Sequence, residues 1–244
     1  MAPARIAWRL AAVTDVLVET PSAKTLVLDV PGWPGHVAGQ HVDVRLTAED
    51  GYQTERSYSI SSAPDGERLA LTVVRVADGE VSPYLTDELR PGDRIELRGP
   101  VGGYFVWEPE QGGPLLLVGG GSGIAPLMAM VRLRATVGND ADTRLLASSR
   151  TYDDILFRAE LEQLAGNGLT VVHALTMSQP HGWTGFARRV DADMLAEIGP
   201  SPAAMPRMYV CGPTPFVEAV AEALVGLGHA PHRIKTERFG PTGE

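Results

Sequence analysis

A glycine-rich turn in the second half of the chain carries a clear chemical signal. An apolar run over 115–118 leads through Gly121 and Gly123 to Pro126, where a helical pattern begins. Glycines let a backbone approach a pyrophosphate, and a helix start offers free N–H groups and the positive end of its dipole. The spacing is G-x-G-x-x-P, not the G-x-G-x-x-G/A of the common dinucleotide fold. The turn therefore predicts a dinucleotide site of a different family, with a purely structural turn as the alternative.

The end of the next predicted strand bears on the choice of dinucleotide. In the common fold an acidic residue here binds the ribose 2′-hydroxyl, whereas an arginine accommodates a 2′-phosphate. This chain has Ser148, Ser149 and Arg150 at that place, which favours NADPH and leaves NADH possible. The alternative is a solvated arginine, because Asp153 and Asp154 follow and could cap the next helix.

The first half carries an R-x-Y-S motif at Arg56, Tyr58 and Ser59 on a predicted strand. Strand alternation puts Arg56 and Tyr58 on one face and Ser59 on the other. By itself such a set indicates a cross-strand aromatic beside a surface arginine. The segment over 79–82, at a predicted helix start, adds a backbone nest that could bind phosphate.

Composition excludes several kinds of site. The 244 residues include one cysteine, so an iron-sulfur cluster, a cysteine-based zinc site and a disulfide are not expected. The six histidines show no metal-binding spacing, and we expect no metal site. A net charge of -9 disfavours nucleic acid and anionic membranes as partners.

The elements that position these motifs change period along the chain. Short alternating runs in the first half predict a small antiparallel barrel, and β-α alternation in the second half predicts a doubly wound parallel sheet. The first-half strands are predicted over 25–30, 41–46, 56–60, 69–76 and 94–98, with a helix over 82–89 that Ser82 caps. The second-half strands are predicted over 115–118, 143–148, 169–174, 208–211 and 233–239, and the helices over 125–137, 155–165, 190–198 and 215–227. A polar linker over 108–114 divides the chain into domains 1–110 and 111–244.

No apolar run in the chain is long and uninterrupted enough for a signal peptide or a membrane span. A cytoplasmic location is therefore expected.

Together the motifs resemble the ferredoxin-NADP reductase family of flavoproteins over nearly the whole chain. Each motif is weak alone, but all of them in this order are highly specific. They are Gly39-Gln40, the R-x-Y-S at 56–59, the G-x-x-S at 79–82, Arg98-Gly99-Pro100 with Gly102, the glycine turn at 119–126, Cys211-Gly212-Pro213 and Glu237-Arg238-Phe239. The resemblance implies a flavin-binding barrel followed by a pyridine-nucleotide domain, and the lone cysteine indicates a version without a fused iron-sulfur domain.

For the flavin, the resemblance implies that Arg56 pairs with its phosphates, that Tyr58 lies against the isoalloxazine and that Ser59 sits near N5. It further implies that the FAD pyrophosphate is cradled by Gly79, Val81 and Ser82.

For the nucleotide, the resemblance implies an NADPH path along Gly121, Gly123 and Pro126, with Ser149 and Arg150 on the 2′-phosphate. Cys211 would stand beside the nicotinamide, although a lone buried cysteine is often only a small hydrophobe. Glu237 and Phe239 match a family carboxylate and terminal aromatic, except that five residues follow Phe239. Two roles are open for Phe239: it would cover the flavin face, or it would pack against the barrel. The catalytic candidates are Ser59, Cys211 and Glu237.

The implied activity is transfer of hydride from NADPH to FAD, followed by electron transfer to a separate acceptor protein, a ferredoxin or an oxygenase component. The alternatives are an NAD(P)H reductase of a small acceptor (free flavin, a quinone or a ferric chelate) and, more distantly, a non-catalytic nucleotide-binding regulatory module. An acidic ferredoxin would need a local basic patch on this acidic chain. The candidates for such a patch are Arg56, Arg75, Arg188, Arg189 and Arg238.

Overall fold

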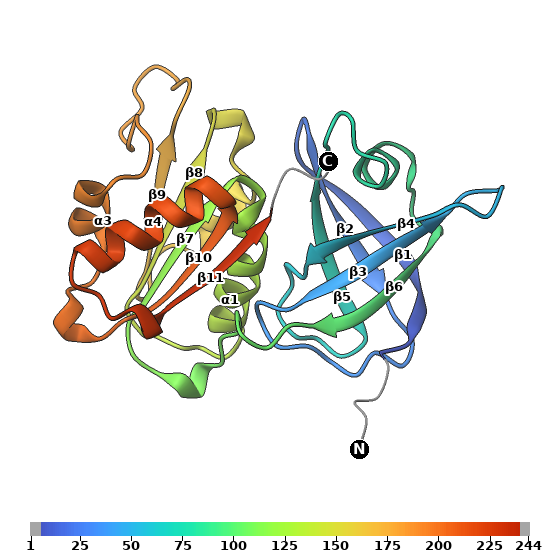
Figure 1. Ribbon diagram of the computed structural model, residues 1–244, viewed down its shortest axis with the longest axis horizontal. Coiled ribbons are helices and arrows are strands. Elements are labelled where there is room, and N and C mark those ends of the chain that lie inside the picture. The colour runs from blue at the N-terminus through green and yellow to red at the C-terminus, as the bar shows by residue number, and fades with distance from the viewer. Residues whose placement is uncertain (1–5, 240–244) are drawn as a thin grey trace.

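Short β-branched runs between Gly and Pro turns fold the first half into a six-stranded antiparallel sheet in the computed structural model, which describes residues 6–239. The strands are β1 (Trp8–Thr20), β2 (Ala23–Asp29), β3 (His41–Thr47), β4 (Gln53–Ser59), β5 (Arg68–Val74) and β6 (Arg94–Val101). Their order is β4-β3-β6-β1-β2-β5, and a bridge between Ile60 and Leu71 brings the two edges together. The predicted barrel-like first half is confirmed (Figure 1).

The longest strand, β1, is not among the predicted strands. Its register against β2 shifts between Val13 and Asp15 and again between Val18 and Thr20. Each irregularity resets the inward and outward alternation, so the 13 residues show no continuous period of two.

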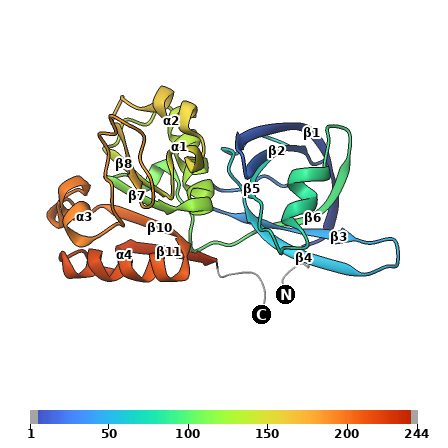
Figure 2. The same cartoon turned by 90° about the horizontal axis from the view of Figure 1, so that it is seen from above.

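The second half is a five-stranded parallel sheet in the order β11-β10-β7-β8-β9, as predicted. Its elements are β7 (Leu115–Gly120), α1 (Ile124–Thr136), β8 (Thr143–Ser149), α2 (Arg158–Leu164), β9 (Leu169–Leu175), α3 (Ala192–Ile198), β10 (Arg207–Pro213), α4 (Thr214–Gly226) and β11 (Ile234–Phe239). Helices α1 and α2 cover one face of the sheet, and α3 and α4 cover the other (Figure 2). None of the helices in the described chain is long and apolar enough to cross a membrane.

The largest shift of a helix start is at α2, and one predicted helix cap does not form. Helix α2 begins at Arg158 rather than at 155, because Phe157 adopts a left-handed conformation with φ of 55°. In the first half a helical turn does form near 82–88, but the Ser82 hydroxyl does not cap it. It accepts the Val76 N–H at 3.0 Å instead.

The two halves share a hydrophobic core. Ala38, Phe105 and Trp107 belong to the same buried cluster as the inner face of α1. The Tyr209 hydroxyl donates to the Val106 carbonyl at 2.8 Å across the same junction. The predicted division after residue 110 falls between β6 and β7 and stays a prediction. The five residues after Phe239, noted in the sequence, lie outside the described residues.

Candidate functional site

Two of the clefts between the halves are lined by residues of the sequence motifs. The larger cleft, of about 710 Å³, is lined by β3, β4, β5, the 79–82 loop and the end of β11. The smaller cleft, of about 530 Å³, is lined by the glycine turn and the carboxyl ends of β8 and β10. Ser122 and Val74 line both, so the two clefts meet at these residues. Both volumes are within the range of small-molecule sites.

Strand β4 brings Arg56, Tyr58 and Ser59 to the larger cleft. The register pairs Tyr58 with the buried Val42, and Ser59 with His41, so Tyr58 and Ser59 take opposite faces as predicted. Burial raises the pKa of Tyr58 to about 12, against the opposing effect of the Arg56 charge. The Tyr58 hydroxyl therefore stays protonated and available as a donor.

The 79–82 loop forms one wall of the larger cleft. The Gly79 N–H donates to the Val76 carbonyl, and a side chain at Gly79 would place its Cβ 3.1 Å from the Ser82 hydroxyl. In the described part of the chain, the N–H groups of Glu80 and Val81 donate no hydrogen bond. Two unpaired N–H groups on a cleft wall fit an anionic group such as a pyrophosphate.

Glu237, on β11, lines the larger cleft next to β10. Its Oε1 lies 3.7 Å from Nδ1 of His41, and its Oε2 is buried with no partner among the described residues. Burial raises the pKa of Glu237 to about 7, while burial lowers the pKa of His41 against the opposing Asp43 charge. Both shifts favour neutral side chains, so Glu237 can gain or lose a proton near neutral pH.

Cys211 pairs with Glu237 across β10 and β11 but is only 1% exposed. It is not among the residues that line either cleft. Burial raises the pKa of its thiol, and the Glu237 charge adds to this effect. Cys211 is therefore buried beside Glu237, which lines the larger cleft.

In the glycine turn, one glycine is needed for packing and another lines the smaller cleft. A Cβ at Gly123 would lie 2.2 Å from the Cys211 carbonyl oxygen, so only glycine lets α1 start against β10. Gly121 has a φ of +54° with open space beside it and lines the smaller cleft. Pro126 is buried in α1 and, like Gly123, lines neither cleft.

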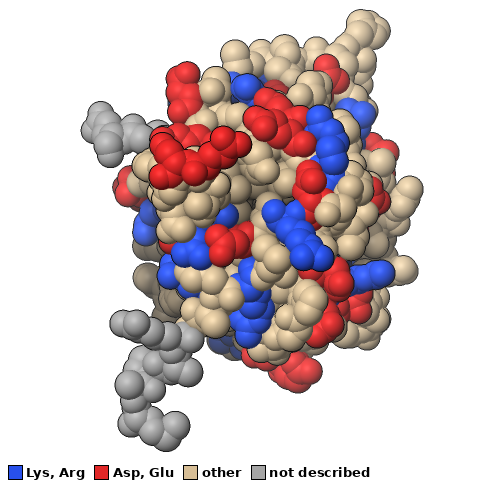
Figure 3. All heavy atoms as spheres, turned by 90° about the vertical axis from the view of Figure 1, so that its right-hand side faces the viewer, with Lys and Arg blue, Asp and Glu red and all other residues tan. Residues whose placement is uncertain are grey.

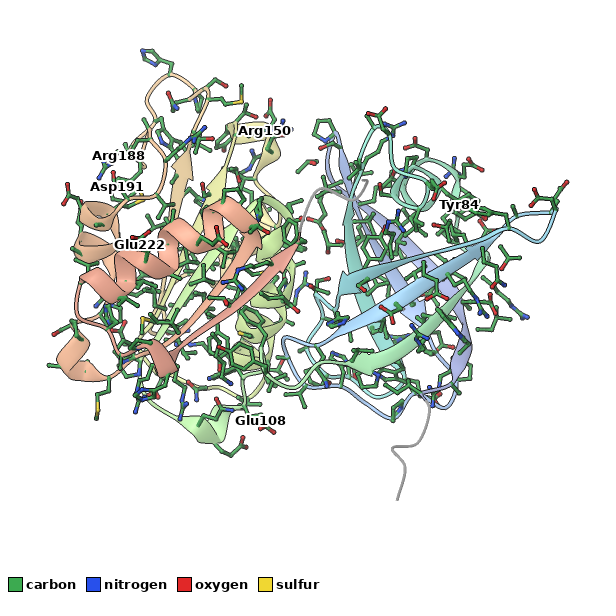
Figure 4. The ribbon with its side chains drawn as sticks, in the orientation of Figure 1. Tyr84, Glu108, Arg150, Arg188, Asp191 and Glu222 are labelled. Carbon is green, nitrogen blue, oxygen red and sulfur yellow. The ribbon has the colours of Figure 1, made fainter. Side chains whose placement is uncertain are left out.

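Ser149 and Arg150 line the smaller cleft, and so does Arg189, which was not predicted at a nucleotide site. The Arg150 side chain is 74% exposed, and its Nε is 4.0 Å from a carboxylate oxygen of Asp154. That carboxylate also accepts from Thr151 in a capping box. Figure 4 shows Arg150 on the side of its domain that faces the barrel.

Further residues of the larger cleft were not predicted. Asp43 accepts from the Ser57 hydroxyl at 2.6 Å and from Arg98 at 2.8 Å, and all three line the cleft with His41. The sequence feature that could have indicated them is the alternating pattern of β3, the strand that pairs with the R-x-Y-S strand. Ser122 belongs to the glycine turn, but no role was predicted for it, and it lines both clefts.

The five arginines named as candidates for a docking patch lie in different places, because Arg56 and Arg238 line the larger cleft and Arg189 lines the smaller one. Arg75 pairs with Asp87 at 2.8 Å, and Arg188 pairs with Asp191 at 2.7 Å. Arg188 lies at the edge of its domain remote from the barrel (Figure 4). Over the barrel end of the molecule, acidic and basic side chains are interspersed (Figure 3).

Residues 13–106 match the oxidoreductase FAD-binding domain, and residues 117–222 match the oxidoreductase NAD-binding domain. NADH-cytochrome b5 reductase 1 of Emericella nidulans is 34% identical over 215 residues, covering 84% of this chain and 67% of that protein. A glycine betaine monooxygenase reductase subunit of Pseudomonas aeruginosa is 34% identical over 209 residues, covering 84% of this chain but 56% of the subunit. The chain thus spans little more than half the length of that relative.

Solved structures agree. The FAD/NAD-binding domain of a nitric oxide dioxygenase from Vibrio cholerae superposes with a TM-score of 0.85 at 27% identity, covering 96% of this chain and 99% of that one. An Amycolatopsis cytochrome P450 reductase gives a TM-score of 0.85 at 27% identity, covering 98% and 71%. A FAD-binding sheet and a nucleotide-binding sheet in this order define a FAD-dependent NAD(P)H oxidoreductase. The chain belongs to the ferredoxin-NADP reductase family, so the predicted family, fold and pair of cofactors are confirmed.

Proposed function

We propose that the protein takes hydride from NADPH onto FAD and delivers the electrons to a separate acceptor protein, an oxygenase component or a ferredoxin. The observation that carries this proposal is the meeting of the two clefts at Ser122 and Val74. A cofactor in one cleft and a nucleotide in the other would have their reactive rings in contact there. Relatives named as reductase subunits of a monooxygenase support the separate acceptor.

The residues of the larger cleft suit FAD. Arg56 and the N–H groups of Glu80 and Val81 would hold its phosphates, the Ser82 hydroxyl would support the loop, and Tyr58 would lie against its ring. Bound FAD supplies the two-electron acceptance and the one-electron release.

The remaining side chains would exchange a proton at the flavin and contact its ring. Ser59 would donate or accept at the ring edge, and Glu237 would exchange a proton through Oε2, for which the described chain provides no partner. Cys211 would support Glu237 from the neighbouring strand β10. Phe239, 37% exposed at the end of β11, would cover the ring face until the nucleotide arrives.

The choice of NADPH rests on the smaller cleft. Arg150 and Arg189 bring two guanidinium groups to its wall, and Ser149 adds a hydroxyl, a donor set that suits a phosphate. The names of the cytochrome b5 reductase relatives favour NADH as the second candidate.

An anaerobic titration of the purified protein with NADPH and with NADH tests the proposal by flavin absorbance. We expect stoichiometric FAD and more efficient bleaching by NADPH. Equal bleaching by NADH would remove the role of Arg150, and a preparation that binds no FAD would contradict the whole proposal. It would also favour the regulatory module.

A reductase of small acceptors is the other candidate function. The mixed charges around the barrel end favour it, because they give a protein partner no single sign to recognise (Figure 3). Fast turnover with free flavin, a quinone or a ferric chelate, and slow reduction of oxygenase components or ferredoxins, would support this candidate.

A further inference from the structure

One arginine links the two halves directly beside the larger cleft. Arg132, on α1, donates from Nη1 to the Ser61 carbonyl at 2.7 Å. Ser61 belongs to the first half and is fully buried, and it follows Ser59 by two residues. The hydrogen bond is charge-assisted and therefore stronger than one between neutral groups.

The guanidinium is held in one orientation by the nucleotide domain. Its Nε and Nη2 donate to the two carboxylate oxygens of Glu160 at 2.8 and 2.6 Å. The Phe157 ring lies 4.9 Å from it, and the left-handed backbone at Phe157 is part of the turn that leads into α2. Because Glu160 binds Nε and Nη2 of the guanidinium, Nη1 remains to donate to Ser61.

Ser61 is equally fixed on the barrel side. Its N–H donates to the Ala70 carbonyl at 2.8 Å, and its hydroxyl accepts from Thr72 at 2.9 Å. Thr72 pairs across strands with Thr25 and lines the larger cleft. A rigid group therefore receives the Arg132 hydrogen bond.

Short, stiff segments connect both ends of this contact to the reacting region. Arg132 lies about 12 Å along α1 from Ile124, the first residue of the helix that follows the glycine turn. Arg132 and Ser61 are not among the residues lining the clefts. A shift at their contact would move the glycine turn relative to Ser59.

We propose that Arg132, held by Glu160 and Phe157, is a positioning residue that sets the distance between the nucleotide-binding turn and the flavin-binding strand. The inference rests on the proposed function, in which two rings must meet between these elements. Arg132 would act through α1, because it lines neither cleft.

The first test measures the relation of the two halves without nucleotide. Glu88→Cys in the first half and Glu222→Cys on α4 provide exposed sites for nitroxide labels, while the native Cys211 is buried. Pulsed electron paramagnetic resonance on the FAD-loaded protein gives the distance between the labels. We expect Arg132→Gln to shift or broaden the distance distribution.

Arg144→Gln is the matched control. Arg144 also donates to backbone carbonyls, those of Ile198 and Gly199, and pairs with Asp142, but all of these lie in the nucleotide domain. We expect it to leave the distance distribution unchanged. A lysine cannot make the two hydrogen bonds to Glu160 and also reach Ser61. We therefore expect Arg132→Lys to shift the label distances less than Arg132→Gln does. It replaces Arg132→Gln if that variant folds poorly.

The second test follows ring contact on mixing with NADPH or NADH under anaerobic conditions. We expect Arg132→Gln to keep its FAD and its affinity for the oxidised nucleotide, to lose the long-wavelength charge-transfer absorbance, and to bleach about tenfold more slowly or worse. Unchanged label distances, unchanged charge-transfer absorbance, or equal changes in Arg144→Gln would each overturn the inference. If the wild-type protein reacts with neither nucleotide, the proposed function fails, and the label distances alone decide the role of Arg132.

Discussion

At the scale of single residues, Glu237 combines burial, an oxygen with no partner among residues 6–239 and a position on the larger cleft. Its pKa of about 7, raised by burial, means that the folded protein binds a proton which the unfolded chain releases above its ordinary pKa of 4.5. Stability is therefore lost as pH rises from about 4.5 through 7.

Glu237→Gln should remove this loss. We expect the variant to gain stability relative to wild type between pH 5 and pH 8, by roughly 2–3 kcal/mol in total. Thermal unfolding of both proteins at the two pH values measures the effect. A stability difference that does not change with pH would mean that Glu237 titrates as an ordinary surface carboxylate.

The pKa of Cys211 predicts an inert thiol. Because the side chain is 1% exposed and burial raises its pKa, we expect no reaction with a thiol reagent in the native protein at pH 8. Denaturant should release one reactive thiol per chain, the single cysteine of the sequence. Rapid labelling of the native protein would place Cys211 on an open surface.

At the scale of elements, the glycine turn depends on two different properties of glycine. Gly121→Ala meets open space but forces a left-handed alanine, at a cost of about 1–2 kcal/mol. Gly123→Ala puts a methyl group against the Cys211 carbonyl and should cost about 3 kcal/mol or more. Urea unfolding followed by circular dichroism compares the two, and equal stability would show that α1 can shift freely on β10.

Local pattern predicted most of these elements, and the exceptions have physical causes. Strand β1 was missed because its bulges break the alternation, and the start of α2 was placed too early because Phe157 is held in a left-handed conformation by tertiary packing. The motif residues were found by type and spacing. His41, Ser122 and Arg132 were not, because their roles depend on cross-strand register and on contacts between the halves, which no local period encodes.

At the scale of the whole molecule, α1 and residues of the first half share one buried cluster, so we expect the two sheets to unfold as one cooperative structure. In a Trp183→Phe variant, the remaining tryptophans lie at 8, 33 and 107, all in the first half or at the junction. Their fluorescence and the far-ultraviolet circular dichroism, to which the helices of the second half contribute strongly, should change at the same denaturant concentration. Separate midpoints would show that the halves unfold independently.

If FAD fills the larger cleft and nucleotide the smaller one, as proposed, the two ligands touch at Ser122 and Val74, and we expect their binding to be thermodynamically linked. Where the two ligands touch, each covers apolar surface of the other that stays in water when either binds alone, so the coupling should be favourable. By reciprocity, the factor by which nucleotide tightens FAD equals the factor by which FAD tightens nucleotide. The affinity for FAD then depends on the nucleotide concentration, and lowering the concentration of either ligand weakens the binding of the other.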